Sequence, residues 1–245
     1  MRTQFDLWMK DGWKELFGDE PDGKRLDQFY RYYELLIQWN EVMNLTAITE
    51  MDQVVTKHFL DSLSLVRAVP ELGSRPWSML DLGTGAGFPG IPLKIAFPEL
   101  NLVLMDSLNK RVGFLKEVIR ELGLEGIEAV HSRAEDGGRN PAYRERFDFC
   151  VSRAVANLST LSEYCLPFVK VGGYFVPYKS GMAGEEAKEA QKALQLLGGK
   201  EEKSVSFCLP GTDMERTLFL IRKTAPCPKK YPRKAGLPGK EPLGR

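Results

Sequence analysis

The stretch Met79-Leu80-Asp81-Leu82-Gly83-Thr84-Gly85-Ala86-Gly87-Phe88-Pro89-Gly90 joins an apolar segment that ends in an acid to a loop with four glycines. Glycine has no β-carbon, so the backbone N–H groups of such a loop can approach a ligand closely. Nucleotide-like cofactors bind in this way, at the carboxyl ends of the parallel strands of open α/β sheets. The stretch therefore predicts an α/β protein that uses a cofactor.

Strand and helix patterns alternate around this loop. The spacing predicts strands at 77–82, 100–105, 127–131, 147–152 and 173–178, with helices at 89–97, 109–122, 158–168 and 184–197. Such alternation favours a Rossmann-like, mainly parallel sheet with right-handed crossovers. Two further strands, near 203–209 and 216–222, are separated by a Pro-Gly turn, so we expect an antiparallel hairpin at one edge of a seven-stranded sheet.

The first part of the chain has the spacing of amphipathic helices. Apolar and aromatic residues recur at helical intervals in two runs: Leu26, Phe29, Tyr30, Tyr33, Leu36, Ile37, then Val54, Val55, Phe59, Ser62, Leu63, Val66. We therefore expect three parts, with a helical cap at 1–72, a cofactor-binding domain at 73–224 and a Pro-rich arm at 225–245 packed with that domain.

Composition excludes several classes of protein. Hydrophobic residues make up 43% and charged residues 27% of the chain, as in soluble globular proteins. No apolar run approaches the ~18 residues of a membrane span, and the N-terminus lacks the apolar core of a signal peptide, so we expect a cytoplasmic protein with no membrane partner. Four scattered cysteines and two histidines predict neither a disulfide framework nor a metal site.

The charge is unevenly distributed. Residues 222–245 hold eight Lys/Arg and one Glu, which leaves 26 basic against 32 acidic residues in the rest of the chain. The same segment contains five prolines and three glycines, too many for a regular helix or strand. The pattern indicates a basic arm that lies along a surface or a partner, and a solvated tail stays the alternative.

The glycine loop alone does not identify the cofactor. Gly85-Ala86-Gly87-Phe88-Pro89-Gly90 also satisfies the G-x-G-x-x-G pattern of NAD-binding proteins. Asp106 ends the second strand about 20 residues later, where an acid binds the ribose hydroxyls of either NAD or S-adenosylmethionine; a plain helix N-cap is the alternative for it. The acid Asp81 before the loop and the edge hairpin resemble class I methyltransferases.

Further segments make the resemblance specific. They are Trp39-Asn40, Asn44-Leu45-Thr46-Ala47-Ile48, His58-Phe59-Leu60-Asp61-Ser62-Leu63, Arg133-Ala134-Glu135, Ser152-Arg153-Ala154-Val155-Ala156 and Lys230-Tyr231-Pro232-Arg233-Lys234-Ala235-Gly236-Leu237-Pro238. With the glycine loop they resemble the bacterial ribosomal small-subunit methyltransferase G family, also called glucose-inhibited division protein B. The resemblance runs from about residue 25 to the C-terminus, and a variable helix at 184–197 falls outside it.

The resemblance implies a cytoplasmic enzyme that transfers a methyl group from S-adenosylmethionine to N7 of a guanine in 16S rRNA. Its implied cofactor residues are those of the loop and of the next three strand ends: Gly83, Gly85, Gly87, Phe88, Asp106, Ser107, Leu108, Ala134, Glu135 and Arg153. Asp106 would hold the ribose and Ala134-Glu135 would flank the adenine. Ser132 stands where the family often has Gly, which affects only the local turn.

The missing acid–base groups fit this chemistry. Guanine N7 carries a lone pair and no proton, so its methylation needs no general base and no catalytic residue is certain. The slot after the fourth strand reads Ser152-Arg153-Ala154-Val155. It lacks the Asn/Asp-Pro-Pro-aromatic clamp of exocyclic-amine methylases and the nucleophilic cysteine of cytosine-C5 enzymes. An NAD-dependent oxidoreductase, a non-catalytic RNA-binding module and a methyltransferase for another RNA, a protein or a small molecule stay open as alternatives.

Two groups of residues are candidates for the substrate side. His58 and Asp61 share a helix face, and together with Arg153 we expect them to border the guanine; a helix-surface hydrogen bond, or for Arg153 a structural ion pair, is the alternative. Lys229, Lys230, Arg233 and Lys234 of the basic arm are expected to contact rRNA phosphates. The expected partner is 16S rRNA or the small ribosomal subunit, bound by a monomer.

Overall fold

A seven-stranded sheet forms the centre of the computed structural model, which describes residues 1–153, 156–180 and 183–244. The strands are β1 (Ser78–Leu82), β2 (Asn101–Asp106), β3 (Ile127–His131), β4 (Phe147–Ser152), β5 (Val169–Lys179), β6 (Gly199–Cys208) and β7 (Glu215–Lys223). Their order is β3-β2-β1-β4-β5-β7-β6. Strands β1 to β5 are parallel, whereas β7 is antiparallel to β5 and β6 to β7. The predicted parallel sheet with an antiparallel edge hairpin is confirmed.

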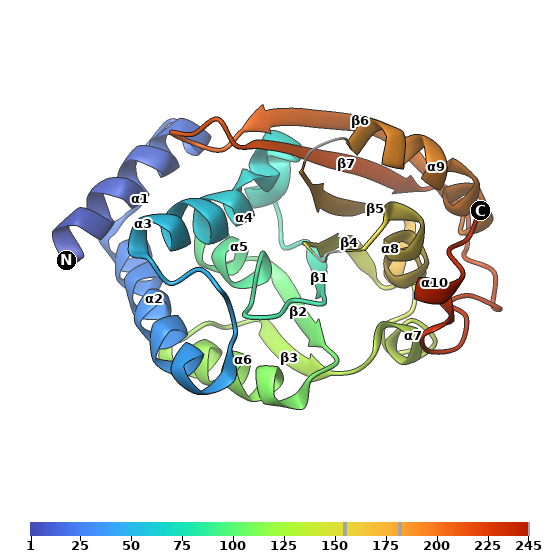
Figure 1. The fold of residues 1–245 in the computed structure, drawn as a ribbon, viewed down its shortest axis with the longest axis horizontal. Coiled ribbons are helices and arrows are strands. Elements are labelled where there is room, and N and C mark those ends of the chain that lie inside the picture. Colours follow the sequence, from blue (N-terminus) through green and yellow to red (C-terminus); the bar gives the residue numbers. More distant parts are fainter. Residues whose placement is uncertain (154–155, 181–182, 245) are drawn as a thin grey trace.

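Helices cover both faces of the sheet (Figure 1). Helices α5 (Gly90–Ala96) and α6 (Asn109–Glu121) lie with the N-terminal helices on one face; α7 (Ala134–Gly137), α8 (Leu158–Cys165), α9 (Ala183–Leu196) and α10 (Leu237–Lys240) lie on the other. Because side chains alternate along a strand, Met79 of β1 joins the first hydrophobic core and Leu80 the second. The carboxyl ends of β1, β2 and β4 thus meet between two packed layers.

The N-terminal helices share the first core with the sheet. Helix α1 (Arg2–Phe17), which the spacing did not single out, precedes α2 (Gly23–Met43), whose first turn is capped by the Asp22 carboxylate. The buried stripe of α2 is Leu26, Phe29, Tyr32, Leu35 and Leu36. The expected Tyr30, Tyr33 and Ile37 are only half-buried, and Tyr32 takes the central buried position instead.

The segment before the sheet is less regular than expected. In place of one helix over 54–66 it forms α3 (Met51–Val54), a π-helical turn (Val55–Leu60), α4 (Asp61–Leu63) and a 3₁₀ turn (Ser64–Arg67), and a second 3₁₀ turn (Pro70–Gly73) leads to β1. The Arg153 guanidinium donates to the carbonyls of Lys57 and His58 within this segment. These hydrogen bonds come from outside the segment and bind carbonyls of its π-helical turn, which is wider than an α-helical turn.

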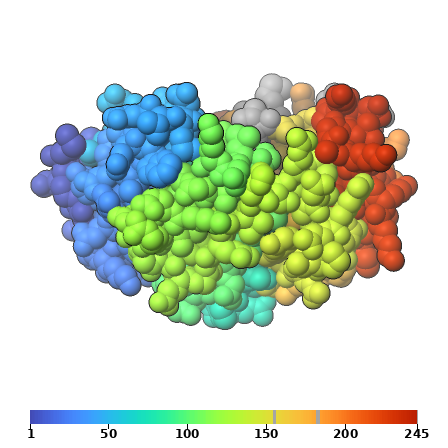
Figure 2. Space-filling view, turned by 90° about the horizontal axis from the view of Figure 1, so that it is seen from below, coloured from blue at the N-terminus to red at the C-terminus, as the bar shows by residue number. Residues whose placement is uncertain are grey.

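The carboxyl-terminal arm (residues 225–244) follows β7 back across α7 and α8 and ends beside α9. Figure 2 shows the arm in red against the yellow-green segment that contains α7. Cys227 and Tyr231 are buried in the second core, so the arm is packed rather than solvated. Within the described residues, no helix has both the length and the apolarity to cross a membrane.

Candidate functional site

A cavity of about 490 Å³ opens where β1, β2 and β4 end. Its lining residues are Leu82, Gly83, Met105, Ser107, Leu108, Ser132, Arg133, Ala134, Glu135, Ser152, Leu161, Tyr164 and Gly236. The volume falls within the roughly 300–1,000 Å³ of small-molecule sites. Open α/β sheets bind their ligands at this edge, so the cavity is the candidate cofactor site.

The glycine loop borders this cavity through Gly83 and is held by Asp81. The hydroxyl of Thr84 and the amide of Gly90 both donate to Oδ2 of Asp81, at 2.6 and 2.8 Å. A β-carbon at Gly90 would lie 2.8 Å from that same oxygen, so the loop packs against the carboxyl group only because residue 90 is glycine. The acid before the loop therefore fixes both of its ends.

Burial raises the pKa of Asp81 to about 7. The side chain is fully buried, and among the described residues its Oδ1 atom accepts no hydrogen bond. Desolvation of the charged form outweighs the two hydrogen bonds to Oδ2 and the attraction of Arg153, which act in the opposite direction. The carboxyl group that organises the loop therefore titrates near neutral pH.

Asp106 ties the loop to the start of α6. One carboxylate oxygen accepts from the amide of Gly85 and the other from the amide of Leu108, both at 2.9 Å. Arg111 lies 3.6 Å from the first of these oxygens. Leu108 occupies the N-cap position of α6, so Asp106 is not the helix N-cap that was weighed as its alternative. A carboxylate has more lone pairs than these two amides use, so Asp106 can also accept hydrogen bonds from ribose hydroxyls.

The donor set and the walls of the cavity fit an adenosine group. Leu82, Met105, Leu161 and Tyr164 offer apolar surface to a purine ring. Ala134 and Glu135 begin α7 at the cavity, and the Glu135 carboxylate is 7% exposed and accepts from the amide of Gly236 at 2.9 Å. A buried carboxylate with free lone pairs beside an apolar wall is suited to bind the exocyclic amine of adenine.

Of the residues predicted for the cofactor, Gly83, Ser107, Leu108, Ala134 and Glu135 line the cavity. Gly85 and Asp106, joined by a hydrogen bond, adjoin these residues, whereas the α-carbon of Gly87 faces Ile91 and Tyr32. Phe88 and Arg153 lie behind the loop instead, where Arg153 is 5.7 Å from the centre of the Phe88 ring. Ala154 and Val155 of the same motif fall outside the described residues.

His58 packs against Phe88 rather than facing an open surface. The two rings are stacked with their centres 4.5 Å apart, and His58 is 8% exposed. Its Nε2 lies 2.9 Å from the Thr46 hydroxyl and its Nδ1 lies 3.1 Å from the carbonyl of Lys57. Burial, with the nearby Arg153 charge, lowers the pKa of His58 to about 4. The imidazole is therefore neutral, with its proton on Nδ1.

Asp61 joins two arginines from distant parts of the sheet. Its carboxylate lies 3.1 Å from Arg153 after β4 and 3.0 Å from Arg216 on β7. Asp61 is 3% exposed, and Arg153 also donates to the Ser62 hydroxyl at 3.0 Å. Arg153 connects the two residues of this segment, since it donates to the carbonyl of His58 and pairs with the carboxylate of Asp61. The ion pair weighed as the alternative for Arg153 is present.

Tyr32, Tyr164 and Gly236 are among the residues of the site that were not predicted. Tyr32 of α2 is fully buried and its hydroxyl donates to the carbonyl of Ala86 in the glycine loop. Tyr164 and Gly236 line the cavity from α8 and the arm. A tyrosine within a helical apolar stripe is a usable signal, since its hydroxyl needs a buried partner. No local pattern marks Tyr164, and Gly236 stood only within the tail motif, without a role at the cofactor.

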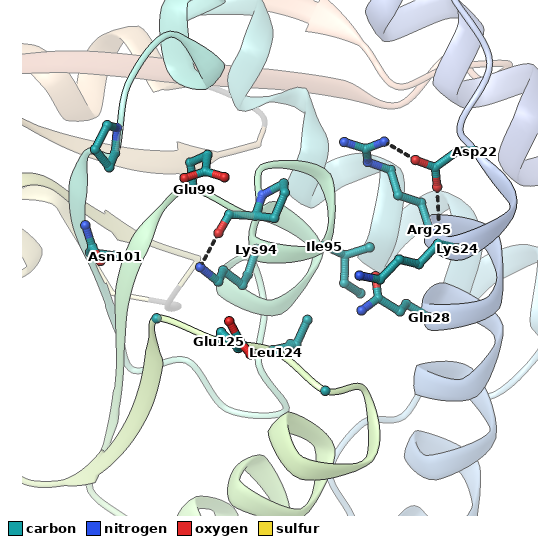
Figure 3. Close-up of a pocket in the computed structure, with 14 residues that line it drawn as sticks. Asp22, Lys24, Arg25, Gln28, Lys94, Ile95, Glu99, Asn101, Leu124 and Glu125 are labelled. Atoms are coloured by element: carbon teal, nitrogen blue, oxygen red, sulfur yellow. Dashed lines mark hydrogen bonds and ion pairs between the residues drawn. The ribbon is translucent and has the colours of Figure 1, made fainter.

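A second cavity, of about 650 Å³, lies at the opposite edge of the sheet (Figure 3). It is bounded by the start of α2, the end of α5 and the turn before β3. Three of its charged side chains have partners: Arg25 pairs with Asp22 at 2.5 Å, and the Lys94 ammonium donates to the carbonyl of Pro98 at 2.6 Å. This cavity lies at the amino ends of the strands, away from the carboxyl ends where open α/β sheets bind their ligands.

Among the described residues, no group of three or more His, Cys, Asp or Glu side chains is arranged to hold a metal ion. Cys150 is buried in β4 next to Cys165, and burial raises its pKa well above the usual value. Such a thiol is a poor nucleophile.

Three features define a class I S-adenosylmethionine-dependent methyltransferase. They are the strand order, the glycine loop preceded by Asp81, and Asp106 at the end of β2. Solved structures share the fold. A putative sarcosine dimethylglycine methyltransferase from Galdieria sulphuraria superposes with a TM-score of 0.53 at 13% identity, over 81% of this chain and 98% of that chain. A putative transferase from Pyrococcus horikoshii gives a TM-score of 0.51 at 13% identity, over 66% of this chain and 63% of that chain.

The family follows from sequence. The model of the rRNA small subunit methyltransferase G family matches residues 25–217. Ribosomal RNA small subunit methyltransferase G of Lachnoclostridium phytofermentans is 59% identical over 93% of both chains, and that of Alkaliphilus metalliredigens is 51% identical over 96% of this chain and 97% of its own. The chain belongs to this family, and the resemblance read from its motifs is confirmed. An NAD-dependent oxidoreductase is thereby set aside.

Proposed function

We propose that this protein methylates N7 of a guanine in 16S rRNA, with S-adenosylmethionine as the methyl donor. The observation that carries the proposal is the placement of the family motifs. The glycine loop, Asp106 and the 134–135 pair, distant in sequence, surround one cavity of suitable volume and chemistry. Membership of the family gives the substrate class.

The reaction asks for alignment rather than acid–base catalysis. The bound cofactor supplies a methyl carbon attached to a sulfonium sulfur, and guanine N7 offers a lone pair in the plane of the base. The chain contributes orientation: Asp106 and Glu135 fix the nucleoside end, and the loop held by Asp81 fixes the end that carries the methyl group. Good alignment of reactants lowers a barrier by roughly 7–11 kcal/mol.

The neutral His58 and the paired Arg153 fit this scheme. N7 methylation leaves a positive charge on the base, so a protonated His58 near it would repel the product. Arg153 is paired with Asp61. It also holds the segment that carries His58, whose ring stacks on that of Phe88. We propose that the buried Phe88–His58 pair supports the glycine loop from behind and so helps to hold the cofactor in line with the target base.

The arm supplies the proposed RNA contacts. Lys229, Lys230 and Lys234 are exposed, and clustered lysines bind phosphates with salt-dependent affinity. Arg233, expected to join them, has its guanidinium occupied by Glu163 at 2.7 Å, so we leave it out of the RNA-binding set. We further propose that the protein acts in the cytoplasm as a monomer on the small subunit or its precursor.

The test is methyl transfer from labelled S-adenosylmethionine to small ribosomal subunits taken from cells that lack this enzyme. We expect label in 16S rRNA at one guanine, and strand cleavage after borohydride and aniline treatment at that nucleotide, which is specific to N7 methylation. Naked 16S rRNA, tRNA and bulk protein serve as parallel acceptors. Label only in another acceptor, or on another atom of the base, would refute the proposal.

A further inference from the structure

The carboxyl-terminal arm is clamped onto the two helices that border the cofactor cavity. Arg144 donates to the carbonyls of Cys227 and Tyr231, both at 2.8 Å, and Arg139 donates to the carbonyl of Pro232 at 2.7 Å. These anchors place residues 227–232 against the segment that follows α7 (Figure 2). The arm therefore has a fixed path before it reaches the cavity.

An ion pair between Glu163 and Arg233 fixes the next part of the arm. Glu163 of α8 is fully buried, and its two carboxylate oxygens accept from the amide and the guanidinium of Arg233 at 2.7 to 3.1 Å. The hydroxyl of Thr160, one turn earlier on α8, donates to the carbonyl of Pro238 at 3.1 Å. The segment between these two contacts is held against α8.

Gly236 is the part of this segment that reaches the cavity. It lines the cavity together with Tyr164, and its amide donates to Oε1 of Glu135 at 2.9 Å. Its φ of +81° is a backbone conformation that residues other than Gly and Asn rarely adopt. The arm thus completes one wall of the cavity and orients the carboxylate that faces it.

We propose that Gly236 is a positioning residue for the cofactor, acting through Glu135, and that the arm couples binding of rRNA to retention of the cofactor. The second part rests on the proposed function. Lys229, Lys230 and Lys234 lie within seven residues of Gly236 on the same clamped segment. RNA phosphates that bind these lysines also restrain Gly236, which forms one wall of the cavity. Such coupling is reciprocal, so RNA strengthens cofactor binding as much as the cofactor strengthens RNA binding.

The first test measures the affinity of the free, full-length protein for S-adenosylhomocysteine by calorimetry. Alanine at position 236 is strained at this φ, and rotation of the peptide to relieve the strain removes the amide from Glu135. We expect Gly236→Ala to weaken binding about fivefold, and Gly236→Asn, which tolerates the left-handed conformation, to retain most of the affinity.

Gly18→Ala is the matched control. Gly18 has the same φ of +81° and, like Gly236, has open space where a β-carbon would stand, but it ends α1 far from the cavity. We expect it to lower the melting temperature as much as Gly236→Ala does, with unchanged affinity for S-adenosylhomocysteine. Equal affinities of wild type and Gly236→Ala, or equal losses in both alanine variants, would overturn the inference.

The second test repeats the titration with small ribosomal subunits present. We expect the wild type to bind S-adenosylhomocysteine about fivefold or more tightly on the subunit, and Gly236→Ala to bind the subunit normally but to lose most of that gain. An unchanged wild-type affinity on a bound subunit would overturn the coupling alone. A wild type that binds and methylates no subunit would instead refute the proposed function, while the titration of the free protein still decides the role of Gly236.

Discussion

At the scale of single residues, Tyr32 is the link between the N-terminal helices and the glycine loop. Its hydroxyl reaches the carbonyl of Ala86, and its ring packs 5.4 Å from that of Phe88. Tyr32→Phe removes only that hydroxyl and leaves a buried carbonyl without its partner, which costs about 1–3 kcal/mol. Because the loosened loop borders the cavity, we expect S-adenosylhomocysteine to bind several-fold more weakly, measured by calorimetry.

Tyr33→Phe is the control on the same helix, since Tyr33 is half-buried and its hydroxyl lies 3.5 Å from the carbonyl of Thr49. We expect this variant to match the wild type in stability and in cofactor affinity. Tyr32→Phe and Tyr33→Phe with the same affinity would contradict the assigned link.

Asp81 gives the protein a specific pH response. Its pKa is raised from the usual value of 3.8 to about 7, so the folded state binds its proton more tightly than the unfolded state. This contribution to stability is fully present below pH 3.8 and is lost as the pH rises through 7. Asp81→Asn keeps a neutral side chain at all pH values, and we expect its stability relative to wild type to improve between pH 5 and pH 8 by on the order of 2 kcal/mol.

Chemical denaturation of both proteins at pH 5 and pH 8 measures this difference. Asp148→Asn is a useful comparison, because the pKa of Asp148 is shifted in the opposite direction to that of Asp81. The pKa of Asp148 is lowered, and its carboxylate forms an ion pair with Lys170 at 2.5 Å. An unchanged stability difference between Asp81→Asn and wild type at the two pH values would show that the carboxyl group is ionised throughout.

At the scale of elements, the strands and the helices between them were predictable because apolar runs alternate with amphipathic spacing. The π-helical turn at Val55–Leu60 was not, since its carbonyls are bound by Arg153, which follows β4 and is 95 residues from His58 in the sequence. The cofactor site divides in the same way. Gly83, Asp106 and Ala134 follow strand ends, which sequence can locate, whereas Tyr164 and Gly236 reach the cavity only through tertiary packing.

The arm shows how this limit affects one residue. By charge alone Arg233 resembled its lysine neighbours, but it pairs with the fully buried Glu163. Arg233→Ala leaves that carboxylate buried without a counter-charge, and we expect a loss of about 3–5 kcal/mol in the free energy of unfolding. Lys234→Ala, on the exposed neighbour, is expected to change it by less than ~0.5 kcal/mol. Urea denaturation distinguishes them, and similar values for both would assign Arg233 to the surface.

At the scale of the whole molecule, the cap, the sheet and the arm share two hydrophobic cores rather than forming separate ones. Residues of α1 and α2 pack with the sheet in the first core, and arm residues pack with α8 and α9 in the second. The boundaries at 72 and 224 therefore stay a prediction about how the chain is organised. A truncation after Thr224 would expose the second core, so the role of the arm in RNA binding is better tested by substitution.

Charge is distributed on the same scale, with the exposed lysines of the arm attached to an otherwise acidic chain. Each phosphate contact adds close to 0.9 to the slope of log affinity against log salt concentration. Replacing Lys229, Lys230 and Lys234 together with alanine is expected to weaken binding to the small subunit and to reduce that slope by about 2–3. Fluorescence anisotropy over a series of salt concentrations measures both quantities.

Alanines at the exposed Lys14, Lys200 and Lys203 remove the same charge elsewhere and are expected to leave the slope nearly unchanged, because long-range attraction is screened beyond about 10 Å at 0.1 M salt. Equal reductions in the two triple variants would mean that net charge, rather than the arm, governs RNA binding.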